Sequence, residues 1–323
     1  MDAKYIVFLL IGAIIGAGLS YVVSSHLLLT PSGSSNLTGN ATNVTVVFAV
    51  ELNDHSAAFW IAYDKGWFSD AGINVEVRTF STGLDLAIEM SRGDIDVALV
   101  CVGPAIVIKS KGVDLRLVAM THLHGYALVA RPEYNSIEEL NGKLVSVSGP
   151  GSPVWLLAHL VEEKYNVTFE YRKMPPFMAV NALMSGKIDA AFIPEHYATL
   201  VEAMGAHVLL RSQDVWPSMP GSGVVVMKKF LDKHPDIVAK IVEIIGKATD
   251  YIREHPDEAA KIVAKHLATD YGIMKKSMEH LDYTIEINTT AIKEYIDLLV
   301  RFGAIDKPIS VEEFIDTKFI GET

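Results

Sequence analysis

Residues 90–100 read "MSRGDIDVALV", and residues 184–193 repeat the phrase as "MSGKIDAAFI". In each copy an apolar helical segment stops at a glycine, Gly93 or Gly186, which can take the left-handed conformation that ends many helices. An Ile-Asp pair then opens an apolar run with the length of a buried strand. Each copy is therefore predicted to be the second half of a strand–helix–strand unit. One such turn is common in α/β proteins, but two in the same strand position predict two α/β lobes.

Length and composition agree with two lobes. The chain has 323 residues, half of them hydrophobic, which is enough for one large core or two medium ones. Its net charge of −11 and the lack of a dense Lys/Arg run argue against a nucleic-acid partner. Cys101 is the only cysteine, so the sequence excludes an intrachain disulfide and a Cys-x-x-Cys redox pair.

The N-terminus contains an uncharged stretch, "YIVFLLIGAIIGAGLSYVV", over residues 5–23. At about 1.5 Å per residue this length matches the roughly 30 Å hydrocarbon core of a bilayer. We therefore expect residues 1–29 to be a membrane anchor, with a cleaved signal peptide as the alternative.

A segment rich in Ser, Thr, Gly and Asn follows at residues 30–43 and is expected to be a linker. It carries three Asn-x-Thr sequons, at Asn36, Asn40 and Asn43. The combination predicts a glycosylated linker that holds a domain on the outer face of the cell membrane.

From residue 44 onward, β-branched runs alternate with amphipathic segments, which is typical of α/β folds. Strands are predicted at 44–50, 73–80 and 95–100, and helices at 57–68 and 83–93. Open α/β sheets bind ligands at the carboxyl ends of their strands, so the loops at those ends are the candidate site.

Three stretches resemble the solute-binding proteins of ABC importers for nitrate, sulfonate, taurine and thiamine precursors. The resemblance is carried by "HSAAFWIAYDKGWFSDAGI" (55–73), "SIEELNGK" (136–143) and "ALMSGKIDAAFIPEHYA" (182–198). The resemblance implies the type II periplasmic-binding-protein fold, in which two α/β lobes are joined by two crossing strands. Here the crossings are expected near 126–134 and 221–229. Lobe 1 would then comprise 44–134 plus 216–323, and lobe 2 would comprise 135–215.

The same resemblance implies an extracytoplasmic solute-binding component of an ABC importer, not an enzyme, that closes as a clamp on a small polar or anionic organic solute. Its partners would be a permease and an ATPase, and no cofactor is expected. Two alternatives stay open: an enzyme on the same fold, of the thiamine-pyrimidine or menaquinone-pathway type, and a sensory ectodomain.

The loop "SGPGSP" at 148–153 has the chemistry of an anion site. Ser152 is a good helix N-cap and Pro153 suits the first helical position, so a helix should begin there. Helix N-termini carry unpaired N–H groups and partial positive charge. The resemblance places a ligand oxyanion against Ser148, Gly149, Gly151 and Ser152, although an ordinary capped helix would look the same.

Further candidate contacts follow the other predicted strands. They are Asn53, His55, Ser56, Thr82, Gly83, Cys101, Val102 and Gly103 in lobe 1, His122 near the crossing, and Pro194 and Glu195 in lobe 2. A carboxylate at Glu195 would repel an anion unless it is protonated or accepts a hydrogen bond from the ligand, so an amine or heteroaromatic solute also stays possible. Imidazoles at His55, His122, His124 and His196 could bind metal, but we expect hydrogen bonding and no metal site.

Overall fold

The computed structural model describes residues 44–320, which belong to one compact unit. The predicted anchor at 1–29 and the sequons at Asn36, Asn40 and Asn43 lie outside the described residues. None of the helices within 44–320 is long and apolar enough to cross a membrane.

Five strands form the first sheet, in the order β2 (Ile73–Phe80), β1 (Val44–Glu51), β3 (Val97–Cys101), β11 (Ser222–Met227) and β4 (Leu115–Met120). β1 runs parallel to β2 and β3, and β11 runs antiparallel to β3. The strand predicted at 73–80 is confirmed, and those predicted at 44–50 and 95–100 differ from β1 and β3 by one or two residues at their ends.

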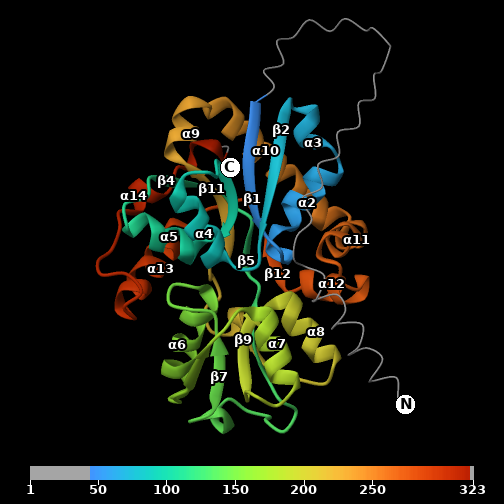
Figure 1. The fold of residues 1–323 in the computed structure, drawn as a ribbon, viewed down its shortest axis with the longest axis vertical. Coiled ribbons are helices and arrows are strands. Elements are labelled where there is room, and N and C mark those ends of the chain that lie inside the picture. The colour runs from blue at the N-terminus through green and yellow to red at the C-terminus, as the bar shows by residue number, and fades with distance from the viewer. Residues whose placement is uncertain (1–43, 321–323) are drawn as a thin grey trace, which may run out of the picture. The chain divides into compact units, whose positions relative to one another are not determined.

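Five other strands form the second sheet, in the order β8 (Glu170–Lys173), β7 (Leu144–Val147), β9 (Ala190–Pro194), β6 (Tyr126–Ala130) and β10 (His207–Arg211). Strand for strand, this order repeats the first sheet: three parallel strands, then an antiparallel strand that enters from elsewhere in the chain. Figure 1 shows the two sheets one above the other. We call the first sheet with its helices lobe 1 and the second with its helices lobe 2.

The repeated phrase occupies the same place in both lobes. Gly93 and Gly186 have φ values of 89° and 71°, in the left-handed region predicted for them. The aspartate of each Ile-Asp pair then binds the neighbouring strand: Asp96 Oδ2 accepts from Val47 N–H at 2.9 Å, and Asp189 Oδ2 accepts from Leu144 N–H at 3.0 Å. The repetition therefore marks an equivalent strand junction in each sheet.

The chain changes sheets at segments other than those expected. β6 is a buried strand inside the second sheet and β11 lies inside the first, so 126–134 and 221–229 are not the crossings. The chain crosses instead at 121–125 and 212–221. There β5 (His122–His124) lies beside 219–221, with His124 N–H donating to Met219 O at 3.0 Å and Gly221 N–H donating to His122 O at 3.2 Å. The polar stretch at 121–125 separates the apolar runs of β4 and β6, so the sequence does mark this boundary, and our expectation placed the crossing one segment too late.

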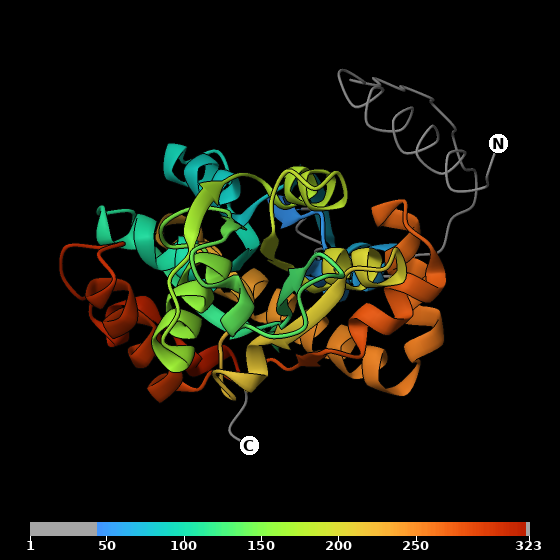
Figure 2. The ribbon, with the colours of Figure 1, turned by 90° about the horizontal axis from the view of Figure 1, so that it is seen from below.

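Helices cover both faces of each sheet. In lobe 1, α2 and α10 pack on one face and α5 and α13 on the other. α8 of lobe 2 packs against α12 of lobe 1. Figure 2 shows the later helices of lobe 1 on both sides of lobe 2.

The α-helices are α2 (Ala57–Asp64), α3 (Trp67–Asp70), α4 (Gly83–Arg92), α5 (Val102–Ser110), α6 (Pro153–Tyr165), α7 (Pro176–Met184), α8 (Glu195–Ala203), α9 (Lys228–Lys233), α10 (Pro235–Glu254), α11 (Pro256–Leu267), α12 (Tyr271–Met278), α13 (Thr289–Arg301) and α14 (Val311–Phe314). Short 3-10 turns occur at η1 (Asp54–Ser56), η2 (Glu138–Leu140), η3 (Ser212–Asp214) and η4 (Thr317–Phe319), and β12 (Leu281–Tyr283) pairs with β5.

Candidate functional site

A cavity lies where the carboxyl ends of strands from both lobes meet. Its volume is about 30 Å³, room for only a few atoms. Lobe 1 contributes Glu51, Asn53, Ser81, Thr82, Gly83, Leu84, Cys101 and Pro104, and lobe 2 contributes Tyr126, Ser148, Ser152, Pro153, Val154, Pro176, Pro194 and Tyr197. The cavity is therefore shared by the two lobes.

A wider groove of about 530 Å³ adjoins the cavity and shares Thr82, Leu84, Pro104 and Ser148 with it. Two lysines, Lys111 of lobe 1 and Lys173 of lobe 2, line this groove. A solute too large for the cavity would extend into the groove, where these ammonium groups favour negative charge.

Ser152 and Thr82 cap facing helices, but their hydroxyls are used differently. Ser152 Oγ accepts from Trp155 N–H at 3.2 Å and Gly149 N–H at 3.4 Å, which leaves its proton for another acceptor. Thr82 Oγ1 accepts from Asp85 N–H at 3.1 Å and donates its proton to Asp85 Oδ2 at 2.7 Å. Ser152 is therefore the better donor to an anion.

Glu51 is the buried acid of the cavity and was not predicted. It is 3% exposed, and its two carboxyl oxygens accept from Cys101 N–H and from Asn53 Nδ2, each at 3.0 Å. Gly83 makes room for it, because a Cβ there would lie 2.6 Å from Glu51 Oε1. The available signal was an acidic residue directly after a buried strand, one residue beyond the strand end that we expected.

Backbone of the two lobes meets beside the cavity. A Cβ on Gly103 of lobe 1 would lie 2.3 Å from the carbonyl oxygen of Gly151 in lobe 2 and 2.7 Å from Tyr295 Oη. Gly151 itself has a φ of 85°. These two glycines allow the lobes to approach.

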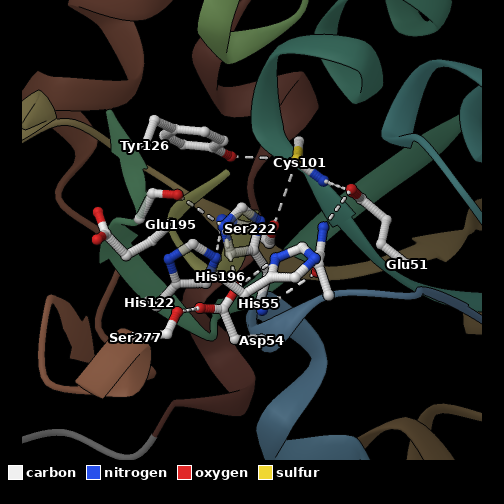
Figure 3. Close-up of polar contacts among 12 residues, drawn as sticks. Glu51, Asp54, His55, Cys101, His122, Tyr126, Glu195, His196, Ser222 and Ser277 are labelled. Carbon is white, nitrogen blue, oxygen red and sulfur yellow. Dashed lines mark hydrogen bonds and ion pairs between the residues drawn. The ribbon is translucent and has the colours of Figure 1, made fainter. Parts of the chain in front are cut away.

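Behind the cavity, polar side chains of both lobes form a buried cluster (Figure 3). His196 Nδ1 of lobe 2 lies 3.4 Å from Asp54 Oδ1 of lobe 1, and Ser277 donates to the other carboxyl oxygen of Asp54 at 2.5 Å. Burial alone would raise the pKa of Asp54, but His196, His55 and Ser277 together lower it to about 2. The rings of His55 and His122 lie 4.4 Å apart, and His122 Nε2 accepts from Ser222 N–H at 3.1 Å. The cluster joins the lobes close to the crossing segments.

Glu195 opens α8 at the position that Val102 occupies at the start of α5. Its Oε1 accepts from Arg211 Nε at 3.1 Å and Thr199 Oγ1 at 3.2 Å. Burial outweighs the attraction of Arg211 and raises the pKa of Glu195 to about 7. The carboxyl group of Glu195, directly after β9 of lobe 2, therefore changes its charge near neutral pH.

Sequence comparison places these residues in a family. The profile described as NMT1/THI5 like matches residues 53–259. The chain belongs to the NMT1/THI5-like family. A Bacillus subtilis protein named for aliphatic sulfonate binding is 26% identical to this family member over 319 residues, covering 94% of this chain and 95% of its own.

Solved structures share the fold of this family member. One is a ligand-binding component of an ABC-type import system from Staphylococcus aureus with zinc bound, at a TM-score of 0.77 and 20% identity over 85% of this chain and 97% of that one. Another is the alkanesulfonate-binding protein SsuA from Xanthomonas axonopodis pv. citri bound to MOPS, at a TM-score of 0.76 and 14% identity over 84% of this chain and 98% of that one. The predicted periplasmic-binding-protein-like α/β fold is thereby confirmed.

Within this family fold, the predicted contact residues separate into two groups. Lining the cavity are Asn53, Thr82, Gly83, Cys101, Ser148, Ser152 and Pro194. Lying outside its lining are His55, Ser56, Val102, Gly103, His122, Gly149, Gly151 and Glu195. The lining residues that were not predicted are Glu51, Ser81, Leu84, Pro104, Tyr126, Pro153, Val154, Pro176 and Tyr197. Tyr126 gave no signal, because a tyrosine in an apolar run gives no sign of which face it occupies.

Proposed function

We propose that the chain is the extracytoplasmic solute-binding component of an ABC importer and captures a small anionic organic solute between its lobes. The observation that carries the proposal is the cavity lined by strand ends of both lobes, with the free Ser152 hydroxyl at a helix N-terminus. Membership in the NMT1/THI5-like family and the names of the similar proteins support it.

The anionic group of the solute would bind at the loop 148–152. Ser152 donates its hydroxyl proton there, the first N–H groups of α6 add positive potential, and Lys173 lies in the adjoining groove. A sulfonate fits these donors best, and nitrate-like anions and phosphorylated thiamine precursors are the other members of the class.

Capture would work by clamp closure about the crossing segments 121–125 and 212–221. A solute that touches both lobes binds the closed form better than the open form, and that difference in affinity drives closure. Small-angle scattering should show a smaller radius of gyration at solute saturation. An unchanged radius would contradict the clamp.

The central experiment is calorimetry of the full-length chain against alkanesulfonates, taurine, nitrate and phosphorylated thiamine-precursor pyrimidines. We expect one member to bind with 1:1 stoichiometry, and mass spectrometry of co-purified material to identify the same class. Binding by none of them, together with binding of an uncharged amine, would overturn the anionic assignment.

We also propose that residues 1–29 anchor the domain and that the linker at 30–43 is glycosylated. A mobility shift after deglycosylation of native material, together with retention in the membrane fraction, is the expected result. For the enzyme alternative, the lone thiol is a poor candidate nucleophile, because burial and the nearby Glu51 raise the pKa of Cys101 well above its usual value.

A further inference from the structure

Three different metal-binding side chains lie together beside the cavity, and two of them, Glu51 and Cys101, belong to its lining. Glu51 lies at the end of β1, His55 in η1 and Cys101 at the end of β3, and one ligand atom from each lies within 4.8 Å of the other two. All three are buried, with exposed fractions of 3%, 1% and 4%. Three separate segments of the chain thus converge on one point (Figure 3).

The carboxylate of Glu51 lacks a cationic partner. Both of its oxygens accept hydrogen bonds from neutral N–H donors, and it forms no ion pair with a basic side chain among residues 44–320. Buried carboxylates are usually paired with a cation or bound to a metal, because burial removes the water that stabilises their charge. The end of β1 therefore carries unbalanced negative charge.

His55, the second residue of the group, has a ring nitrogen that is free to bind an ion. Its Nε2 lies 3.0 Å from Gly125 O, which fixes the ring and assigns the proton to Nε2. Its Nδ1 is buried and has no hydrogen-bond partner in the described part of the chain. A backbone carbonyl behind a histidine is the usual support for a metal ligand, because it selects the tautomer with a free nitrogen.

We infer that Glu51, His55 and Cys101 form a binding site for one divalent cation of borderline softness, such as Zn²⁺. Carboxylate, imidazole and thiolate together suit this class of ion. The adjoining cavity of about 30 Å³, which Glu51 and Cys101 line, has room for a small fourth ligand, either water or an oxygen of the solute.

The geometry requires a modest contraction. With metal–ligand bonds of about 2.0–2.3 Å, the ligand atoms of a tetrahedral site lie roughly 3.3–3.6 Å apart. A pair at the full 4.8 Å would close by about 1.2–1.5 Å, shared between two side chains. Glu51 can adjust by rotation because Gly83 leaves space beside its carboxylate.

Binding would release one proton, because the Cys101 thiol must ionise to coordinate the ion. Tyr126 Oη, 3.2 Å from Cys101 Sγ, could then donate its hydrogen bond to the thiolate.

The test uses Co²⁺ added to metal-stripped, full-length chain. Because Cys101 is the only cysteine, a thiolate-to-cobalt charge-transfer band can come from no other residue. We expect this band to saturate at one Co²⁺ per chain, to disappear on addition of Zn²⁺, and to be absent in Cys101→Ser. Saturating metal without the band would overturn the site.

Two further variants and one control complete the design. Glu51→Gln and His55→Gln should each weaken Zn²⁺ binding by more than the roughly 10–100-fold cost of losing a supporting residue. His159→Gln removes a histidine from α6 and should leave the affinity unchanged. If a variant fails to fold, the presence or absence of the thiolate band in the wild-type cobalt spectrum still tests whether the site exists. Solute binding by the metal-stripped chain tests the proposed function separately, so either proposal can fail alone.

Discussion

The two lobes carry the same strand order and the same Ile-Asp junction, yet their strand ends hold different chemistry. In lobe 1 the aspartate Asp96 makes a hydrogen bond to β1 and has no ion-pair partner among residues 44–320. In lobe 2 its counterpart Asp189 binds β7 and also accepts from Arg131 at 2.5 Å and Tyr134 at 2.9 Å. The shared phrase thus specifies the same backbone junction in both lobes. The surrounding residues decide how much each junction contributes to the stability of the protein.

The largest expected effect compares these two aspartates. Asp189→Ala should cost about 2–4 kcal/mol of unfolding free energy, because charged hydrogen bonds to Arg131, Tyr134 and Leu144 are lost together. Asp96→Ala removes only the bond from Val47 N–H and should cost about 1–2 kcal/mol. Urea unfolding of both variants measures the difference. Equal losses would show that the junctions are equivalent in energy as well as in backbone.

The first residues of α8 and α5 give the second comparison, Glu195 against Val102. Folding raises the pKa of Glu195 from 4.5 to about 7, so the native state holds the proton more tightly than the unfolded state. The contribution of this group to stability is therefore present below about pH 4.5 and is lost as pH rises through 7, on the order of 3 kcal/mol in total.

Glu195→Gln keeps the shape of the side chain but removes its charge. The variant should therefore not lose this stability as the pH rises. The unfolding free energy of the variant, relative to wild type, is expected to increase between pH 4.5 and pH 7. Thermal or urea unfolding across that range measures it, with Val102→Ala as a variant that removes no titrating group. A difference that stays constant with pH would mean that Glu195 is ionised throughout.

The two helix caps give the third comparison. Ser152→Gly should spare α6, since glycine replaces a serine cap at a cost of a few tenths of a kcal/mol, but it removes a donor to the solute. For an anion the loss is about 1.5–3 kcal/mol, or roughly 10–150-fold in affinity. Thr82→Gly should weaken binding less, because the Thr82 proton already binds Asp85. Calorimetry with the identified solute ranks the two. If Ser152→Gly lowers the melting temperature while affinity is unchanged, the loop is structural.

Two glycines give the smallest effect. Gly103→Ala places a methyl group against Gly151 O of the other lobe, an overpacking that costs about 1–3 kcal/mol in the closed form and lowers solute affinity by about 5–150-fold. Gly246→Ala in α10 meets only Ile285, at an ordinary van der Waals distance of 3.4 Å, and should leave affinity unchanged. Adding Tyr295→Phe to Gly103→Ala removes the 2.7 Å contact with Tyr295 Oη within lobe 1, keeps a ring-edge contact at 3.1 Å, and leaves the contact between lobes. Full recovery of affinity in that double variant would show that the lobes do not need this approach.

Local sequence determined the elements of this protein. Glycines that accept positive φ, the Ser152 cap with Pro153, and the apolar runs at β1, β2 and β3 act over a few residues, so their outcome could be predicted from pattern. The repeated Ile-Asp junction was predictable for the same reason, and with it the existence of two sheets.

Only the tertiary structure decided which side chains meet. Glu51, His55 and Cys101 converge because β3 pairs with β1 and because η1 follows β1 into the crevice, and no local pattern contains that pairing. The polar stretch at 121–125 marks a break before β6, but the sheet that β6 then joins was decided by its long-range pairing with β9. Burial then set the charges: the same carboxyl chemistry gives a pKa of about 2 at Asp54 beside histidines and about 7 at Glu195 in a desolvated position. Desolvation and long-range pairing depend on distances between segments, which the order of residues along the chain does not display.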